Sequence, residues 1–221
     1  MTVVDRASPF ENMMRQNIVA AAHALYRSKA GFATFYYSRC NEKYWILTGE
    51  GGFKLRAGVK SSEAIRDIFV NGEQYAFECA TAMMIVLYKA LIETISSERF
   101  DMLYHQLYLW DWEKHPEFPV YTEHITGNGL LGDVRYFKNP DVNPKTPQWQ
   151  GENAVQLPNG QYFGHGIGIL TGEGIIEELN KNRFPGAERS AYLMQTATRP
   201  DFDYLYALSN SRTIYYGGAS H

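Results

Sequence analysis

The stretch YAFECATAMMIVLYKALIETI, from Tyr75 to Ile95, constrains the fold more than any other part of the sequence. From Ala80 to Ile95 the apolar residues leave almost no polar stripe, which is typical of a helix that is buried on all sides. We therefore predict a central helix against which the other elements pack. Cys79 lies at its N-terminal end, where unpaired backbone amides and the positive end of the helix dipole favour a thiolate. It is a candidate nucleophile.

Length and charge limit the class of protein. The 221 residues are 45% hydrophobic, which is enough to bury a substantial core. We expect a single domain over residues 1–221, with a loose tail over 209–221 that has no periodicity. The net charge is −3, from 21 basic and 24 acidic residues, so no bulk positive field exists to attract nucleic acid or an anionic membrane.

Neither membrane insertion nor export is expected. The first twelve residues, MTVVDRASPFEN, contain no basic segment that leads into an apolar run, so we expect no signal peptide and a soluble protein made in the cytoplasm. The longest unbroken apolar run, Cys79 to Tyr88, is too short to span a bilayer. Two cysteines cannot form a disulfide framework in a chain of this length, and both thiols should stay reduced.

Helices and strands are predicted on both sides of the central helix, which indicates an α+β fold. Ser8, Pro9 and Glu11 mark a helix start with capping-box spacing, and Gly31 is its expected end. Further helices are expected over 61–72, 172–183 and 201–208. Strands are expected over 32–38, 44–48, 53–57, 106–112, 134–138, 152–157, 161–170 and 190–198, and residues 115–132 and 139–147 should be loops.

A thiol at a helix start that faces polar residues on later strands is a recurring geometry for acyl transfer. His165, between two glycines, is the one histidine within a strand pattern, and Glu152 lies on the other arm of the same hairpin. If Asn159 and Gly160 form a two-residue loop, Glu152 and His165 share one face of the hairpin. A three-residue loop would turn them to opposite faces. The Asn-Gly pair favours the first arrangement.

Each of these residues also has an ordinary structural interpretation. A buried cysteine at a helix start is more often a small hydrophobic residue, a strand histidine is usually structural, and Glu152 would ordinarily be solvated. Glu78 could be a capping acid whose charge opposes a thiolate. Cys40 is a weaker candidate nucleophile because no helix begins there. No zinc-type spacing, phosphate loop or dinucleotide motif is present, so no metal or other cofactor is indicated.

Several blocks of the sequence together resemble one known family. The match runs from about Met13 to Arg199 and has Cys, Glu and His in that order at similar spacing. It is carried by RQNIVAAA, FATF, AIRDI, FECATA (77–82), YFKNP (136–140), QWQGEN (148–153), YFGHGIGIL (162–170) and SAYLMQTATR (190–199). In these blocks the chain resembles the bacterial spore-coat protein-glutamine γ-glutamyltransferase, or transglutaminase, family.

The resemblance implies a papain-like core and a calcium-independent enzyme that joins glutamine and lysine side chains of proteins. Matched residue by residue, the family's nucleophile falls on Cys79, its acid/base on Glu152 and its histidine on His165, with Glu78 as a spare carboxylate. The family's substrate tunnel falls on Trp112, Tyr136, Trp149 and Asn153. The implied partners are spore-coat proteins, and the implied location is the spore coat; we expect a monomer.

Two other classes of function stay open from the sequence. A cysteine peptidase or amidase would use the same core, with an imidazolium paired to the thiolate and the glutamate secondary. A coat protein that keeps the fold without catalysis would hold Cys79 inert and buried. The effects of substituting Glu152 and His165, and the reactivity of the Cys79 thiol, distinguish these two classes from the transglutaminase.

Overall fold

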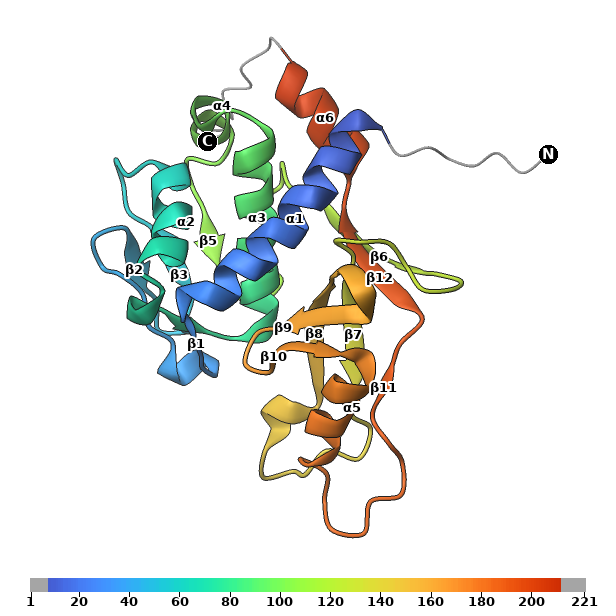
Figure 1. The fold of residues 1–221 in the computed structure, drawn as a ribbon. Helices are drawn as coiled ribbons and strands as arrows, with labels where there is room; N and C mark the ends of the chain where they lie inside the picture. Colours follow the sequence, from blue (N-terminus) through green and yellow to red (C-terminus); the bar gives the residue numbers. More distant parts are fainter. Residues whose placement is uncertain (1–7, 212–221) are drawn as a thin grey trace, which may run out of the picture.

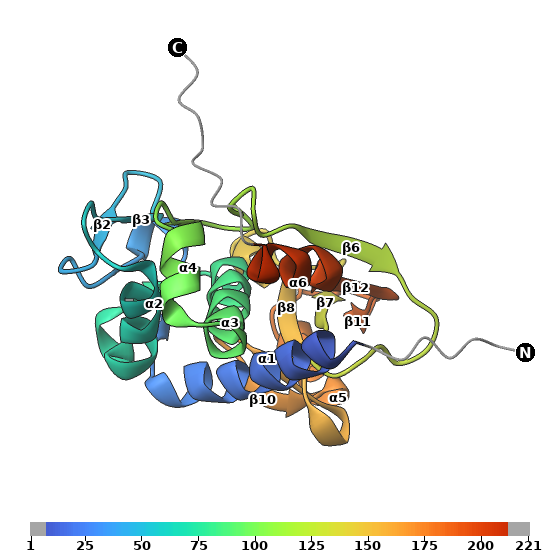
Figure 2. The ribbon, with the colours of Figure 1, turned by 90° about the horizontal axis from the view of Figure 1, so that it is seen from above.

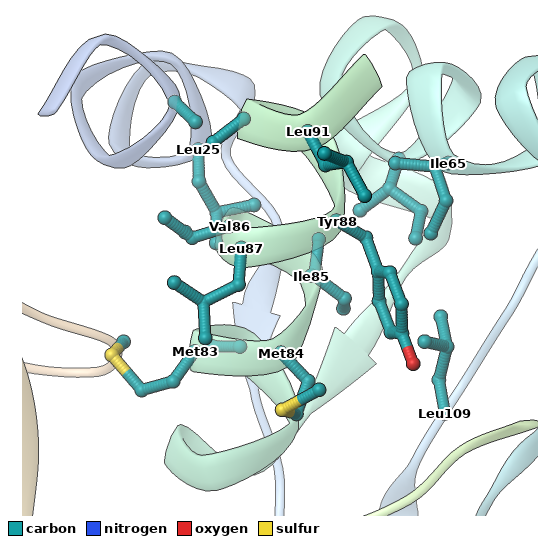
Figure 3. Close-up of a cluster of buried hydrophobic side chains, with 14 of the residues drawn as sticks. Leu25, Ile65, Met83, Met84, Ile85, Val86, Leu87, Tyr88, Leu91 and Leu109 are labelled. Carbon is teal, nitrogen blue, oxygen red and sulfur yellow. The ribbon is translucent and has the colours of Figure 1, made fainter. Parts of the chain in front are cut away.

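Helix α3 (Cys79–Thr94) lies at the centre of the helical half of the molecule (Figure 1). In this computed structural model, which describes residues 8–211, it contacts α1 (Pro9–Ser28), α2 (Ser61–Val70) and α4 (Ser97–Leu103). Every residue from Cys79 to Tyr88 is buried. Figure 3 shows Leu25 and Ile65 packed around its apolar side chains. The prediction of a central helix that is buried on all sides is confirmed.

The start of α1 follows the predicted cap. Pro9 is its first residue, and the Ser8 side chain accepts a hydrogen bond from the Glu11 backbone amide at 3.1 Å. The helix ends at Ser28, earlier than the predicted stop, because Lys29 adopts a left-handed conformation with φ of 63°. α1 then packs along α3, and its first turn lies against α6 (Phe202–Asn210) (Figure 2).

Most strands belong to one large sheet, which occupies the other half of the molecule (Figure 1). Its order is β10-β9-β8-β7-β12-β6, with β11 paired to β7, and all its pairs are antiparallel. A second, three-stranded sheet has the order β2-β3-β5. The strands are β1 (Gly31–Phe32), β2 (Trp45–Leu47), β3 (Phe53–Leu55), β4 (Ala76–Phe77), β5 (Tyr108–Leu109), β6 (Val120–His124), β7 (Val134–Lys138), β8 (Gly151–Gln156), β9 (Gln161–Gly164), β10 (Gly168–Thr171), β11 (Tyr192–Leu193) and β12 (Thr196–Pro200).

The sheet and helix arrangement confirms the α+β prediction, and α5 (Gly172–Asn180) and α6 lie where helices were expected. Four local predictions are wrong. Residues 190–198, expected as one strand, are divided between β11 and the start of β12, with a break at 194–195. Residues 32–38 form the end of β1 and a 3₁₀ turn over Phe35–Tyr37 in place of one strand, since two of those aromatic side chains are exposed to solvent. Residues 106–112 contribute only the short β5, and the expected loop 115–132 contains β6. The helix α4 was not predicted.

The hairpin prediction is also wrong in its turn. Leu157 donates its backbone N–H to Gln161 O, so three residues, Pro158 to Gly160, form the loop. Asn159 takes the left-handed conformation with φ of 60° that completes this turn. Ala154 therefore pairs with Gly164, one residue away from the predicted register. The predicted long second arm is broken after Gly164, and the chain reverses into β10.

None of the helices in residues 8–211 is both long and apolar enough to cross a bilayer. The expected loose tail over 209–221 lies mostly outside the described residues. Its first two positions, Ser209 and Asn210, are the last two residues of α6.

Candidate active site

Cys79 is the first residue of α3, and Glu78 is the residue that caps this helix. The Glu78 side chain uses both oxygens: Oε2 accepts the Ala80 backbone N–H at 2.9 Å, and Oε1 accepts the Cys79 thiol at 3.2 Å. The parallel β1–β4 pair leads directly into this turn and fixes its backbone. A buried thiol, 5% exposed, is thus held against a carboxylate by the ordinary geometry of a helix start.

The surroundings of Cys79 keep its sulfur protonated at rest. Burial raises the pKa of the Cys79 thiol well above its ordinary value, and the negative charge of Glu78, joined by that of Glu152 once this carboxyl ionises, raises it further. The backbone amide and the side-chain amide of Asn153 act in the opposite direction, with Nδ2 at 3.6 Å from Sγ. The expectation that the helix start favours a thiolate is therefore wrong, because burial and the neighbouring carboxyl groups raise the pKa of the thiol.

Glu152 is buried in the middle of the large sheet, with 3% of its surface exposed. Its side chain packs on Gly164, where a Cβ would lie 2.8 Å from Glu152 Cγ, so only glycine fits there. Burial and the charge of Glu78 raise the pKa of the Glu152 carboxyl well above its ordinary value, while the backbone amide of His165 lowers it. Glu152 Oε1 has no hydrogen-bond partner within residues 8–211. The carboxyl is therefore held as a neutral acid.

The turn after β9 holds His165, which is 4% exposed. Its Nε2 lies 3.0 Å from Gly31 O, and its ring stacks on Phe77 with centroids 4.6 Å apart. Burial lowers the pKa of His165 to about 4, although the Gly31 carbonyl raises it, so the imidazole is neutral near pH 7. In the described part of the chain the ring makes no hydrogen bond to the side chain of Cys79 or Glu152. The backbone of His165, and not its ring, faces Glu152.

A cavity of about 530 Å³ opens over Cys79. Its floor is one face of the large sheet, from β8 across β7 and β12 to β6, and its walls are the start of α3 and the loop at residues 111–114. The lining residues are Glu78, Cys79, Ala80, Asp111, Trp112, Lys114, Val120, Thr122, Tyr136, Gln148, Gln150, Gly151, Asn153, Met194, Thr196 and Thr198.

Three of the four predicted substrate-binding residues, Trp112, Tyr136 and Asn153, line this cavity. Trp149 does not line it, and its ring stacks on Phe32 with centroids 6.5 Å apart. Within residues 8–211 there is no group of three or more His, Cys, Asp or Glu side chains arranged to hold a metal ion. Cys40 is a free thiol outside the cavity, and burial raises its pKa to about 11.

Comparison with known proteins identifies the family. The family model described as protein-glutamine gamma-glutamyltransferase matches residues 7–209, a longer span than the sequence blocks indicated. The chain belongs to this family. Its resemblance to the transglutaminases, stated above from the sequence, is thereby confirmed.

Individual relatives agree with the family model. A protein-glutamine gamma-glutamyltransferase of Halalkalibacterium halodurans is 44% identical over 94% of this chain and 74% of its own length. That of Bacillus subtilis is 47% identical over 90% of this chain and 80% of its own. A solved structure, the transglutaminase from Geobacillus stearothermophilus without its C-terminal extension, superimposes with a TM-score of 0.87 at 48% identity, covering 91% of this chain and 96% of that one.

Some residues around the transglutaminase cavity were not found from the sequence. Thr122, Thr196 and Thr198 lie on its floor, with Thr122 Oγ1 2.8 Å from Thr198 Oγ1 across two neighbouring strands. The spacing of the threonines in VYTEH and TATRP could have indicated a shared surface, because residues two apart on a strand lie on the same face of the sheet. Lys114 gave no such signal, since it lies in a loop.

Proposed function

We propose that this transglutaminase forms ε-(γ-glutamyl)lysine cross-links between proteins through a thioester on Cys79. The observation that carries the proposal is the buried thiol at a 530 Å³ cavity, in hydrogen-bond contact with Glu78 and close to the neutral acid Glu152. The names of the relatives support the same reaction.

In the first half-reaction Cys79 Sγ attacks the γ-carbonyl carbon of a substrate glutamine. Its proton passes to the Glu78 carboxylate, which already accepts the thiol at 3.2 Å. The C–N bond of the carboxamide then breaks, and the leaving nitrogen takes a proton and departs as ammonia. Glu152 supplies that proton, because its raised pKa keeps it protonated near neutral pH. The amides of Asn153 beside Sγ stabilise the negative charge that develops there.

In the second half-reaction the thioester carbon is attacked by the ε-amine of a substrate lysine. Glu152, ionised after the first half-reaction, accepts a proton from the incoming nitrogen, the C–S bond breaks, and Glu78 returns the proton it took from the thiol to the departing sulfur, which restores Cys79. His165 acts as a positioning residue: its neutral ring is held by Gly31 O and Phe77, and its backbone amide faces the Glu152 carboxyl. Trp112 and Tyr136 narrow the cavity around the reacting atoms.

We further propose that the reaction needs no calcium, that the substrates are spore-coat proteins and that the enzyme acts at the spore coat as a single-domain monomer. The resemblance to spore-coat transglutaminases supports these points.

The peptidase alternative has less support. It needs an imidazolium paired with the thiolate, whereas the His165 ring bonds to Gly31 O and has its pKa lowered to about 4. If Glu152→Gln keeps full activity and His165→Ala abolishes it, the glutamate-centred mechanism is wrong.

One assay tests the function directly. A glutamine-containing protein is incubated with a fluorescent primary amine, with and without a chelator, using wild type and Cys79→Ala. We expect covalent fluorescence with wild type in both conditions and none with the variant. No incorporation by wild type would refute the transferase proposal, and incorporation lost only with chelator would refute calcium independence.

A further inference from the structure

The strand β6 forms one edge of the large sheet, next to the cavity. It pairs only with β12 in the part of the chain that the structure describes, and Figure 2 shows it along the border of the sheet. An edge strand presents unpaired backbone N–H and C=O groups, to which another extended chain can add.

The register shows which residues of β6 have outward-facing backbone groups. Asp201 donates to Pro119 O and Ile125 donates to Gln195 O, so the odd-numbered residues face β12. Hydrogen bonding alternates along an antiparallel pair, so the N–H and C=O of Val120, Thr122 and His124 point to the open side. The Val120 carbonyl confirms this direction, since it accepts Lys114 Nζ at 3.0 Å from outside the sheet.

The same residues that open to the edge also face the active cavity. Val120 and Thr122 line it, as do Thr196 and Thr198 on the next strand. Thr122 and His124 are exposed, and no other described strand pairs with them. Residues directly opposite one another on adjacent strands share a face. A residue paired with Thr122 from outside would therefore project its side chain over the cavity that contains Cys79.

We propose that an extended segment of the glutamine-donor protein adds to the open edge of β6 and so delivers its glutamine to Cys79. This inference rests on the proposed function and specifies how its substrate binds. The main chain supplies hydrogen bonds to Thr122 and His124, independently of sequence, and only the alternate side chains meet the cavity. At the first residue of β6 the Val120 carbonyl already accepts a hydrogen bond from Lys114 Nζ, so the added segment does not pair there.

The chemistry of this edge favours glutamine over lysine. Three of the four cavity residues on β6 and β12, Thr122, Thr196 and Thr198, carry hydroxyl groups, which can bond a neutral carboxamide. The Lys114 ammonium lies at the end of the same edge and would repel a substrate ammonium placed beside it. The lysine-bearing protein is accordingly assigned to another approach to the cavity.

Backbone methylation of the substrate tests the proposal with the wild-type enzyme. A short peptide with one central glutamine and no lysine is compared with versions N-methylated at single positions, and amine incorporation gives KM and kcat. Methylation at the glutamine, or two residues from it, removes an N–H that bonds to β6 and should raise KM about tenfold. Methylation one residue away alters an N–H that points to solvent and is the matched control.

An enzyme variant gives a second measurement. Thr122→Pro removes an outward-facing N–H, which an edge strand tolerates, together with the side-chain hydroxyl, which Thr122→Val also removes. It should raise KM for the parent peptide about tenfold and abolish the alternation at the paired position. Thr122→Val keeps the N–H and should keep the alternation. Circular dichroism shows whether each variant folds; the methylation scan stands if Thr122→Pro does not.

The outcomes separate this proposal from the proposed function. If the wild-type enzyme uses no glutamine donor at all, including a single glutamine whose amino and carboxyl groups are blocked, the proposed transferase function is refuted. If it uses the parent peptide but methylation has no effect or shows no alternation, only the edge proposal is overturned. If N-methylation gives the same alternation in a lysine-donor peptide, the lysine donor occupies the edge and the proposal is overturned. It is also overturned if the enzyme is a dimer that Thr122→Pro dissociates without a change in KM, because a second copy then occupies the edge.

Discussion

Asp133, immediately before β7, and Glu152, on the neighbouring β8, are two buried carboxyl groups with opposite surroundings. Asp133 accepts hydrogen bonds from Arg15, Arg199 and the Leu130 amide, at 2.8 Å, 2.8 Å and 2.8 Å. Burial raises the pKa of Asp133, but the bonds from Arg199 and Arg15 outweigh it, and the net pKa lies below the ordinary value. Within residues 8–211 no cation acts on Glu152, and its pKa is raised.

The difference separates a structural carboxylate from a chemical one. Asp133 is ionised and joins α1 to β12 through two guanidinium groups, so its charge serves the fold. Glu152 is kept neutral at a cost in solvation, next to the thiol and the cavity, so its proton is available. Substitution should therefore affect folding at one position and catalysis at the other.

The largest expected effect is on stability. Asp133→Asn removes the negative charge between Arg15 and Arg199 and should lower the free energy of unfolding by about 3–5 kcal/mol. Glu152→Gln replaces a neutral acid by a neutral amide of the same shape and should change it by about 1 kcal/mol or less. Urea denaturation of the two variants measures both values. Equal losses would show that Glu152 is also a structural charge.

Catalysis should show the reverse order. Glu152→Gln removes a general acid and should lower kcat/KM for amine incorporation about 100-fold. Glu78→Gln should leave some activity, since Glu152 remains, and the double variant should be as inactive as Cys79→Ala. Asp133→Asn is the matched control, assayed below its melting temperature. It should lose less activity than Glu152→Gln, and a greater loss would contradict the division of roles.

The two carboxyls should also give opposite pH dependences of stability. The lowered pKa of Asp133 contributes stability above its unfolded pKa of about 3.9, and this is lost as pH falls through the lower folded value. The raised pKa of Glu152 favours folding below its unfolded value of about 4.3, and this is lost as pH rises toward the higher folded value. Unfolding free energies are measured from pH 3 to pH 8. As pH rises above about 4.3, the stability of the wild type should decrease relative to that of Glu152→Gln.

The smallest effect concerns the thiol. Because burial and two carboxylates raise the pKa of Cys79, iodoacetamide should label the folded enzyme only at higher pH than an ordinary cysteine. Glu152→Gln removes the charge that Glu152 acquires when it ionises at high pH, and should shift the labelling profile to lower pH. Mass spectrometry measures the fraction of Cys79 that is alkylated at each pH, with the free thiol Cys40 as the internal reference. A Cys79 that is never alkylated in the folded chain, at any pH, would favour the non-catalytic alternative.

Local signals predicted much of this molecule. The all-apolar run defined α3, Ser8 and Glu11 defined the start of α1, and the thiol at a helix start indicated Cys79. These features depend on residues within a few positions of one another, so the sequence contains them in full.

Features set by distant contacts were missed. The strand β6 is short and surrounded by Pro and Gly, and only its pairing with β12, from the far end of the chain, makes it a strand. Pro158 joined the turn and shifted the hairpin register by one residue. Gly166, with φ of 100°, reverses the chain after β9, so His165 lies in a turn with its ring against Phe77. Strand periodicity predicted none of these three outcomes.

The cavity takes its walls from residues that are far apart in the order of synthesis. Cys79 and Glu78 are made early, whereas Thr196 and Thr198 on its floor come from the last strand. A ribosome-bound chain that ends before β12 has its nucleophile but lacks the part of the floor that β12 supplies, and β6 lacks the strand with which it pairs. The cavity over Cys79 is therefore complete only once β12 has been made, more than a hundred residues after the nucleophile.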